Sequence, residues 1–563
     1  MPTASSFEEI DIPNVDLWAF LFERKERDFS DDQVIYRSSI GDRKYTYKDV
    51  KKAATSFGEG LQEQWEWQRG DVLNIYAPND IDVGPVIFGT FFAGGIVSPA
   101  NPGYSADELA FQLSNSGSKA IVTTKAFLPA AAKAAKKASI PDNRIILLGE
   151  GRDPDRKFRH WTDVTKASLE NRYRRKKPSN PEKDLAFLVY SSGTTGLPKG
   201  VMLSHSNVVS DLCQIKGSVG HYYQSGQDKI LGVLPFFHIY GLTGLVHQPL
   251  HRGIELVVMP AFDLKLFLET VQKHKITFIY VAPPVIVRLA RDEIVKDYDL
   301  SSIKMITSGA APLTRELVDT VHKKLNIKIN QAYGLSETSP MTHTQPWDEW
   351  YSSVGSVGKI FPNMTAKYMS EDGKELPAGE AGELWMAGPN IFQGYWKNDE
   401  ATKGAIVEAD GLRYFKTGDV GFQDEKHNFY ITDRVKELIK YKGFQVAPAE
   451  LEGKLMDHPL VNDIAVIGVE DREMHTEVPR AYIVHAKKAK EAGDPETGAP
   501  SKGFEKDAQD IIDWTAAKVA NHKRLRGGVR FIDEIPKSAS GKILRRLLKD
   551  KVKKEGTSGK AKL

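Results

Sequence analysis

A run of glycine, hydroxyl and lysine residues lies between residues 191 and 200. It reads Ser191-Ser192-Gly193-Thr194-Thr195-Gly196-Leu197-Pro198-Lys199-Gly200. Glycines allow successive backbone N–H groups to turn toward one point, the hydroxyls add donors, and the lysine adds a positive charge. These groups suit a polyphosphate, although a flexible loop that binds nothing has the same composition.

A Walker A loop is the first comparison to make, because it also holds phosphates with glycines and a lysine. When the count starts at Gly193, Lys199 falls at the lysine position. Pro198, however, replaces the second glycine, and Gly200 replaces the Ser or Thr that would contact magnesium. The spacing therefore disfavours a P-loop nucleotide hydrolase.

The segments around this run predict alternating strands and helices. Residues 185–190 (Leu-Ala-Phe-Leu-Val-Tyr) predict a strand that leads into the run. Between Asp71 and Tyr430, short β-branched runs alternate with amphipathic stretches of helical length, which predicts a multi-layer α/β fold. The predicted strands include 120–123, 145–148, 254–259 and 276–281.

The uncharged segment 83–100 is about long enough to span a membrane. Its glycines and prolines predict a buried helix, a turn and a buried strand instead, so no transmembrane segment is expected.

The composition changes near Asp433, where we place a domain boundary. Residues 1–433 are predicted to form a large N-terminal domain and residues 434–563 a small α+β domain, with a cleft between them. The small domain is predicted to contain helices 449–456 and 508–519, strands 464–469 and 481–485, and a mobile surface loop at 491–503.

The charge balance and the cysteine count exclude several classes of protein. Lysine plus arginine (77) nearly equal aspartate plus glutamate (74), so no global field favours nucleic acid, and small anions are the expected partners. Cys213 is the single cysteine, which rules out an intramolecular disulfide and a cysteine cluster for zinc. Glu8, Glu9 and Asp11 precede any apolar run, unlike a secretory signal.

The last three residues, Ala561-Lys562-Leu563, are close to the Ser-Lys-Leu peroxisomal address. They follow a polar stretch, 555–560, that is predicted to be disordered. We therefore expect the peroxisomal import receptor as a partner and the peroxisomal matrix as the location; the protein stays cytoplasmic if the signal is not read.

Residues 190–201 resemble the phosphate loop of the adenylate-forming superfamily, which includes acyl-CoA synthetases, 4-coumarate:CoA ligases, firefly-type luciferases and the adenylation domains of peptide synthetases. Further segments resemble its other signatures in the same order: 234–241, 308–313, 331–337, 414–419, 433–452 and 536–542. Residues 436–452 are most similar to the 4-coumarate:CoA ligase-like branch. The resemblance covers nearly the whole chain and implies a large α/β domain with a small α+β lid that swings about a hinge near Lys436.

The resemblance implies an acid–thiol ligase that uses ATP to convert an aromatic or medium-chain carboxylic acid to its acyl-adenylate, and then forms the coenzyme A thioester. Carboxylate and phosphate are both anions, so cations and oriented donors are needed where they meet. Lys542 is similar to the lysine that bridges carboxylate and α-phosphate, and His238 to the histidine near the incoming carboxylate. Glu337 is similar to the Mg²⁺ ligand, a role that suits a hard oxygen donor.

The same resemblance implies the nucleotide and thiol sites. Asp419 would accept both ribose hydroxyls, Arg434 would lie near the ribose and phosphate, and Tyr333 against the adenine. The residues assigned to ATP are Ser191, Ser192, Gly193, Thr194, Thr195, Gly196, Lys199, Gly309, Ala310, Gln331, Tyr333, Gly334, Ser336, Asp419 and Arg434. Lys442 and Gly443 are assigned to coenzyme A, and Lys440 and Gln445 to catalytic contact with the acyl-adenylate.

The acyl pocket that the resemblance implies is apolar and of modest volume, which favours an aryl or medium-length alkyl acid. Its predicted lining is Tyr240, Thr307, Ala310, Ala332, Pro340 and Met341. Ala332 replaces a glycine that is common in the family, and its methyl group narrows the predicted slot.

Three alternatives use the same parts. An amino-acid or aryl adenylation enzyme is one, although no carrier domain is recognisable and the motif around His238 lacks the acid expected to pair with an α-amine. A luciferase-like oxygenase shares the adenylation residues and differs in its later chemistry. A catalytically inactive binding protein is disfavoured because Lys199, Glu337, Asp419 and Lys542 are all retained.

Overall fold

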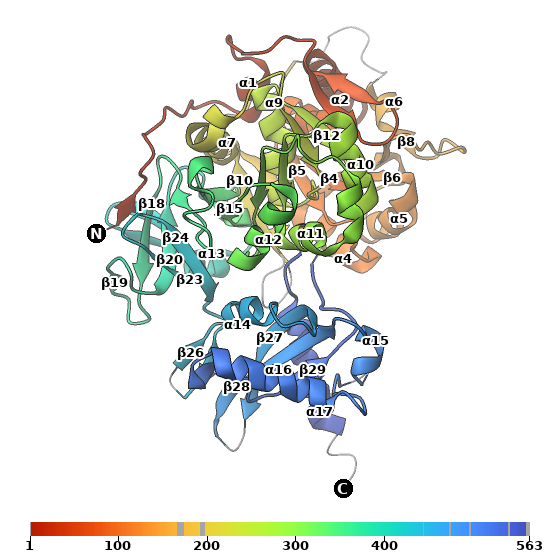
Figure 1. Cartoon of the computed structure of the whole chain (residues 1–563). Helices are drawn as coiled ribbons and strands as arrows, with labels where there is room; N and C mark the ends of the chain where they lie inside the picture. The colour runs from red at the N-terminus through yellow and green to blue at the C-terminus, as the bar shows by residue number, and fades with distance from the viewer. Residues whose placement is uncertain are drawn as a thin grey trace.

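The structure of the chain is a computed structural model. It describes residues 2–165, 174–191, 198–442, 444–471, 474–494, 497–538 and 541–558. A large body holds the N-terminal and central parts of the chain, and a smaller unit, blue in Figure 1, holds the C-terminal part. The predicted fold, a multi-layer α/β body with a distinct C-terminal α+β domain, is confirmed.

The first sheet contains the strand that leads into the glycine-rich run. Its strands pair in the order β21 (Gly394–Tyr395), β10 (Lys199–Ser204), β9 (Leu185–Ser191), β5 (Ile96–Ala100), β4 (Val72–Tyr76), β6 (Ser118–Thr124), β7 (Ile145–Leu148) and β8 (Arg159–His160). Helix α3 (Val83–Phe92) packs on α2 (Tyr47–Trp65). Segment 83–100 is therefore a buried helix followed by a buried strand, as predicted. Among the described residues, no helix has the length and hydropathy of a membrane span.

The second sheet is mainly parallel and brings several loop segments to one edge. Its order is β17 (Lys359–Ile360), β16 (Met341–Thr344), β15 (Ile329–Gly334), β14 (Met305–Ser308), β13 (Phe278–Val281), β11 (Lys229–Gly232), β12 (Glu255–Val258), β2 (Val34–Ser38) and β3 (Lys44–Thr46). Strands β13, β14 and β15 are parallel, so the segments that follow them emerge at the same edge. Helices α11 (Pro283–Arg291) and α12 (Arg315–Leu325) pack together near that edge.

The third sheet is antiparallel and leads toward the C-terminal unit. It runs β1 (Thr3–Ala4), β18 (Thr365–Met369), β20 (Gly382–Ala387), β23 (Leu412–Gln423) and β22 (Ile406–Ala409), with β19 (Glu375–Leu376) beside β18 and β24 (Phe429–Arg434) beside β23. The register places Asp419 of β23 directly opposite Arg434 of β24. Strand pairing thus joins two residues that the sequence separates.

The remaining helices of the large body surround these sheets (Figure 1). Helix α7 (His205–Val219) starts with a capping box, in which Ser204 and Asn207 satisfy each other's backbone N–H groups. The others are α1 (Leu17–Phe22), α4 (Ala106–Ser116), α5 (Leu128–Lys137), α6 (Trp161–Thr165), α8 (Ile239–Gly241), α9 (Gln248–Arg252), α10 (Leu264–His274) and α13 (Asp399–Ala405), with a π-helical turn η4 (Leu242–His247).

The C-terminal unit has its own hydrophobic core, formed by residues between Ile439 and Val552. Its strands are β25 (Ile439–Tyr441), β26 (Phe444–Val446), β27 (Val461–Asp471), β28 (Thr476–His485) and β29 (Val529–Phe531), and its helices are α14 (Pro448–Leu455), α15 (Ala489–Ala492), α16 (Glu505–Lys518) and α17 (Arg545–Ser558). The boundary at residues 433 and 434 and the hinge at Lys436 stay predictions.

Two sequence predictions in this unit are wrong in part. The supposed surface loop 491–503 contains Ala492, which is fully buried, and Gly493, where an added Cβ would lie 2.0 Å from the carbonyl oxygen of Phe531. The supposedly disordered stretch from residue 555 continues α17 as far as Ser558. Both segments gain order from packing or helix continuation, which composition alone does not reveal.

Candidate active site

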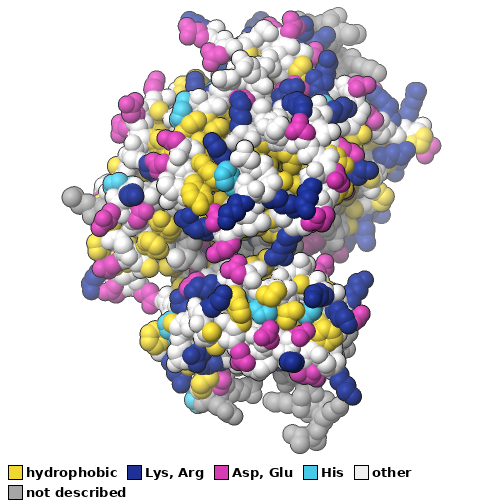
Figure 2. Space-filling model, in the orientation of Figure 1, with side chains coloured by type: hydrophobic (Ala, Val, Ile, Leu, Met, Phe, Trp, Pro, Cys, Tyr) yellow, Lys and Arg dark blue, Asp and Glu magenta, His cyan; other side chains and the backbone are white. Residues whose placement is uncertain are grey.

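A cavity of about 1580 Å³ lies where the C-terminal unit meets the large body. Figure 2 shows basic and acidic side chains on both sides of this junction. The predicted site residues that line the cavity come from both parts of the chain and are Ser191, His238, Ala310, Gln331, Ala332, Tyr333, Gly334, Ser336, Asp419, Arg434 and Lys542. The structure therefore brings most of the predicted nucleotide residues together with the predicted catalytic lysine.

The Asp419 carboxylate is held by two partners at the cavity wall. The Arg434 guanidinium contacts its Oδ1 at 3.0 Å, and the Tyr333 hydroxyl donates to its Oδ2 at 2.6 Å. The Asp419 charge raises the pKa of Arg434, and burial raises the pKa of Tyr333, so the cation stays charged and the phenol keeps its proton. The carboxylate is thereby fixed with lone pairs left to accept hydroxyl groups.

Glu337 is nearly buried in the turn that follows β15. The Tyr395 hydroxyl donates to its Oε1 at 2.9 Å, and the Tyr395 ring lies 5.0 Å from the Lys199 ammonium. Burial and the Glu337 charge raise the pKa of Tyr395, so this hydroxyl remains a donor. Sequence reasoning missed Tyr395, because strand pairing of β21 with β10, not any local motif, brings it here.

The Glu337 carboxylate can hold Mg²⁺ only if a bound nucleotide supplies further oxygen ligands. The described residues contain no group of three or more His, Cys, Asp or Glu that could hold a metal ion. A single carboxylate such as Glu337, completed by phosphate oxygens and water, is the arrangement that Mg²⁺ commonly takes at nucleotide sites.

His238 precedes the short helix α8 and faces the cavity. Its Nδ1 accepts from the Tyr240 backbone N–H at 3.3 Å, which places the proton of the neutral ring on Nε2. Burial, together with the nearby Lys542 charge, lowers the pKa of His238 to about 3. The ring is therefore a neutral hydrogen-bond donor at physiological pH and not a cation.

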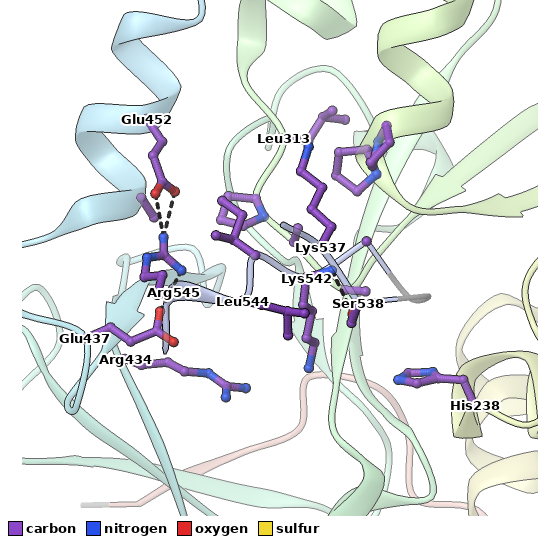
Figure 3. Close-up of a pocket in the computed structure, with 18 of the residues that line it drawn as sticks. His238, Leu313, Arg434, Glu437, Glu452, Lys537, Ser538, Lys542, Leu544 and Arg545 are labelled. Carbon is purple, nitrogen blue, oxygen red and sulfur yellow. Dashed lines mark hydrogen bonds and ion pairs between the residues drawn. The ribbon is translucent and has the colours of Figure 1, made fainter. Parts of the chain in front are cut away.

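Lys542 lies in a tight loop between β29 and α17. Its carbonyl oxygen accepts from the Ser538 backbone N–H at 2.7 Å, and its own N–H donates to the Ser538 hydroxyl at 3.1 Å. Burial and the Arg434 charge lower the pKa of Lys542. In Figure 3 the side chains of Lys542, Arg434 and His238 point into the same space.

Comparison with known proteins places this site in a family. The sequence profile described as "AMP-binding enzyme" matches residues 22–396, and the profile "AMP-binding enzyme C-terminal domain" matches residues 450–542. The chain belongs to the AMP-binding enzyme family. The predicted membership of the adenylate-forming superfamily is thereby confirmed.

The relatives of this AMP-binding enzyme span its length. It is 36% identical to probable 4-coumarate–CoA ligase 1 of Dictyostelium discoideum over 92% of both chains, and 35% identical to 4-coumarate–CoA ligase of Pinus taeda over 97% of both. Its fold matches ATP-bound MatB from Rhodopseudomonas palustris with a TM-score of 0.81, at 26% identity over 96% of this chain and 99% of that one. The anthranilate CoA ligase AuaEII in complex with anthranoyl-AMP, 23% identical over 96% of this chain and 98% of that one with a TM-score of 0.82, shares the fold.

The glycine-rich run of this AMP-binding enzyme is described only at its ends. Ser191 of β9 pairs with Lys199 of β10, and Ser191 and Pro198 both line the cavity. The two described ends of the run therefore lie at the cavity. Ser192, Gly193, Thr194, Thr195 and Gly196 lie outside the described residues, so their role stays a prediction.

The predicted acyl lining is only partly at the cavity. Ala310 and Ala332 line it, whereas Tyr240, Thr307, Pro340 and Met341 are buried in the wall behind. The Tyr240 ring fills the space beside Gly309, where an added Cβ would meet it at 3.1 Å, and its hydroxyl donates to the Thr307 carbonyl at 3.3 Å. Contact of these four residues with an acyl group therefore stays a prediction.

The predicted acyl-adenylate and coenzyme A residues of the C-terminal unit are not at the cavity. Lys440, Lys442 and Gln445 belong to the β25–β26 hairpin, do not line the cavity and are exposed. Gln445 donates to Glu371 of the large body, and the Lys440 backbone N–H to Glu477. Gly443 lies outside the described residues. In this arrangement the C-terminal unit presents the Lys542 loop to the cavity and leaves the hairpin outside it.

Proposed function

We propose that the protein is an acyl-CoA ligase that activates an aromatic or medium-chain carboxylic acid with ATP and then forms the coenzyme A thioester. The observation that carries this proposal is the convergence of Lys542, Arg434 and Asp419 from two structural units on one cavity. Similarity to 4-coumarate–CoA ligases over more than nine-tenths of the chain supports the same reaction class.

In the first half-reaction, a carboxylate oxygen of the acid attacks the α-phosphorus of ATP, and pyrophosphate leaves. The Lys542 ammonium offsets the repulsion between the two anions, and neutral His238 donates a hydrogen bond to the incoming acid without adding charge. Asp419 accepts the ribose hydroxyls. Glu337 would hold Mg²⁺, which would supply positive charge beside the phosphates.

In the second half-reaction, the thiolate of coenzyme A attacks the acyl carbonyl, and AMP leaves. This step needs an open path to the carbonyl, whereas the first needs the mixed anhydride shielded from water. We infer that the C-terminal unit turns about Lys436, withdrawing Lys542 and bringing the hairpin with Lys440, Lys442 and Gln445 to the site.

The acid class follows from the wall of the cavity. Ala310 and Ala332 offer small apolar surfaces, and the buried Tyr240 ring shortens the space behind them. A flat aryl group or a medium alkyl chain suits such a wall better than a long fatty acid.

A substrate panel tests the proposal. The pure protein is incubated with ATP, Mg²⁺ and aryl, alkyl or amino acids, with and without coenzyme A, while pyrophosphate, thioester and emitted light are measured. Thioester that depends on coenzyme A is the expected result. Turnover of amino acids alone, light emission that depends on oxygen, or the absence of any product would instead identify an adenylation enzyme, a luciferase-like oxygenase or a binding protein.

We also propose that Ala561-Lys562-Leu563, which lie outside the described residues, direct the protein to the peroxisomal matrix through its import receptor. The test is a fluorescent protein fused to the N-terminus, compared with and without these three residues. We expect punctate peroxisomal signal only for the full chain; a cytosolic signal from both fusions would contradict the proposal.

A further inference from the structure

Arg545 is the first residue of α17 and lies three positions after Lys542. Its Nη1 contacts Glu437 Oε2 at 2.8 Å, and its Nη2 contacts both carboxylate oxygens of Glu452 at 2.7 Å. Its Nε donates to the Val466 carbonyl at 3.2 Å. The guanidinium is thus held from three elements at once, as Figure 3 shows for the two carboxylates.

These contacts are largely withdrawn from water. The side chain of Arg545 is 13% exposed, that of Glu452 13% and that of Glu437 18%. A buried ion pair gives little net stability, because the cost of desolvation offsets the attraction. The two-nitrogen contact of a guanidinium with a carboxylate nevertheless fixes the relative position of the two side chains. The cluster therefore serves better to hold a geometry than to stabilise the fold.

The geometry that the cluster holds is that of the Lys542 loop. Leu544 donates its backbone N–H to the Pro536 carbonyl at 2.8 Å, which closes the loop just before Arg545. At the other end, the Lys537 ammonium contacts Asp463 at 2.6 Å. Arg545 thus anchors the C-terminal end of the loop, as Lys537 anchors its start.

The same cluster connects the loop to the nucleotide-side residues. Glu437 and Leu438 donate their backbone N–H groups to the Arg434 carbonyl at 2.9 and 3.0 Å, which forms a turn. Arg434 in turn pairs with Asp419. A continuous series of contacts therefore runs from Asp419 through Arg434 and Glu437 to Arg545, and from there to the loop.

We infer that Arg545, clamped by Glu437 and Glu452, is a positioning residue that sets the reach of Lys542 into the cavity during acyl-adenylate formation. The inference rests on the proposed function. All three members of the clamp follow the predicted hinge at Lys436, so they move together when the C-terminal unit turns. Their loss should affect the step that uses Lys542 and spare the step that does not.

The test compares the two half-reactions in Arg545→Lys, which keeps the charge but lacks the planar fork. We expect kcat/KM for acid-dependent ATP–pyrophosphate exchange to fall at least tenfold, while thioester formation from supplied acyl-AMP changes less than twofold. Glu437→Gln, which is nearly isosteric, should show the same selective loss and serves if Arg545→Lys folds poorly. Arg524→Lys, at an exposed position of the C-terminal unit outside the cavity, is the matched control.

Hydrogen exchange gives a readout that does not need turnover. We expect the amides of Lys537, Ser538 and residues 541–544 to exchange several-fold faster in Arg545→Lys and Glu437→Gln, while those of α16 are unchanged. An equal fall in both half-reactions, an unaltered exchange reaction, or unaltered amide exchange in the loop would overturn the inference. A wild-type protein that activates no acid would instead contradict the proposed function, and the amide exchange would still decide the positioning role.

Discussion

At the residue scale, the chemistry of the cavity depends on which side chains are charged and which are not. Lys542 and Arg434 bring positive charge, Asp419 brings negative charge, and the His238 ring is neutral because burial lowers its pKa to about 3. Such a site can draw in an anionic substrate without fixing it so firmly by charge that the product is retained.

Lys542→Ala tests the central cation. We expect acyl-adenylate formation to fall by a hundredfold or more, because Lys537, another cation of the loop at the cavity, is held in an ion pair with Asp463. Thioester formation from supplied acyl-AMP should persist. Both rates are measured on the same preparation, with Lys506→Ala on the exposed face of α16 as the control; equal losses in both rates would contradict the two-pose mechanism.

His247 is a second neutral histidine, fully buried among Phe88, Phe91 and Phe187. Burial lowers its pKa to about 4, below the unfolded value of about 6.5. Above pH 6.5 neither state binds the proton; as the pH falls toward 4, only the unfolded state does, so stability is lost with acid.

Replacement of His247 by Gln, which retains a donor for the Leu242 carbonyl, should weaken the loss of stability at acidic pH. Between pH 7 and pH 5, we expect wild type to lose about 2 kcal/mol more of its unfolding free energy than His247→Gln. Urea unfolding at the two pH values measures the difference. Equal losses would mean that the ring is protonated in the folded state.

At the element scale, two segments of the second sheet lie unusually close together beside the cavity: the end of β15 and the residues just before β16. Gly334 ends β15 beside Tyr333, and an added Cβ would lie 1.8 Å from the Pro340 carbonyl oxygen. The absence of a side chain there allows the turn that carries Glu337 to follow directly. One glycine thus fixes the separation between the Tyr333 and Glu337 positions.

Gly334→Ala should therefore force this pair of segments apart. We expect a loss of about 2 kcal/mol in unfolding free energy together with a large rise in KM for ATP. Gly404→Ala is the matched control, because a Cβ there meets nothing within 4 Å and alanine favours the α13 helix. Thermal unfolding measures the loss of stability, and pyrophosphate release measures KM for ATP. Equal changes of both quantities in the two variants would refute this role of Gly334.

At the scale of the whole molecule, the C-terminal unit is held in the observed pose by contacts across the junction. Arg291 of α11 donates to the Asn462 carbonyl at 3.1 Å and to the Met456 carbonyl at 3.5 Å. Arg291 is exposed, so these bonds are weak individually. A weak latch suits the proposed turning of this unit between two poses.

Arg291→Ala should shift the unit away from this pose. We expect adenylate formation to fall about threefold, in keeping with the loss of exposed hydrogen bonds, while thioester formation from supplied acyl-AMP is unchanged or faster. The control is Arg288→Ala, one turn earlier on α11, whose ion pair with Asp292 stays within the large body. Slower thioester formation in Arg291→Ala would argue against the latch.

The sequence by itself determined the α/β class, the distinct C-terminal domain and the family. Strand and helix patterns such as 83–100 and 185–190 are local, and the signature segments keep their order whatever the tertiary contacts. The sequence also assigned to one site four residues that all line the cavity: Asp419, Arg434, Tyr333 and Lys542. Their individual roles stay predictions.

Only the tertiary structure decided which parts meet in one pose. It placed the Lys542 loop at the cavity and the Lys440–Gln445 hairpin outside it, packed the Tyr240 ring beside Gly309, and brought Tyr395 to Glu337. These outcomes depend on strand pairing, side-chain packing and the orientation of one unit against another. Such contacts join residues far apart in the chain, so no local pattern of residue types encodes them.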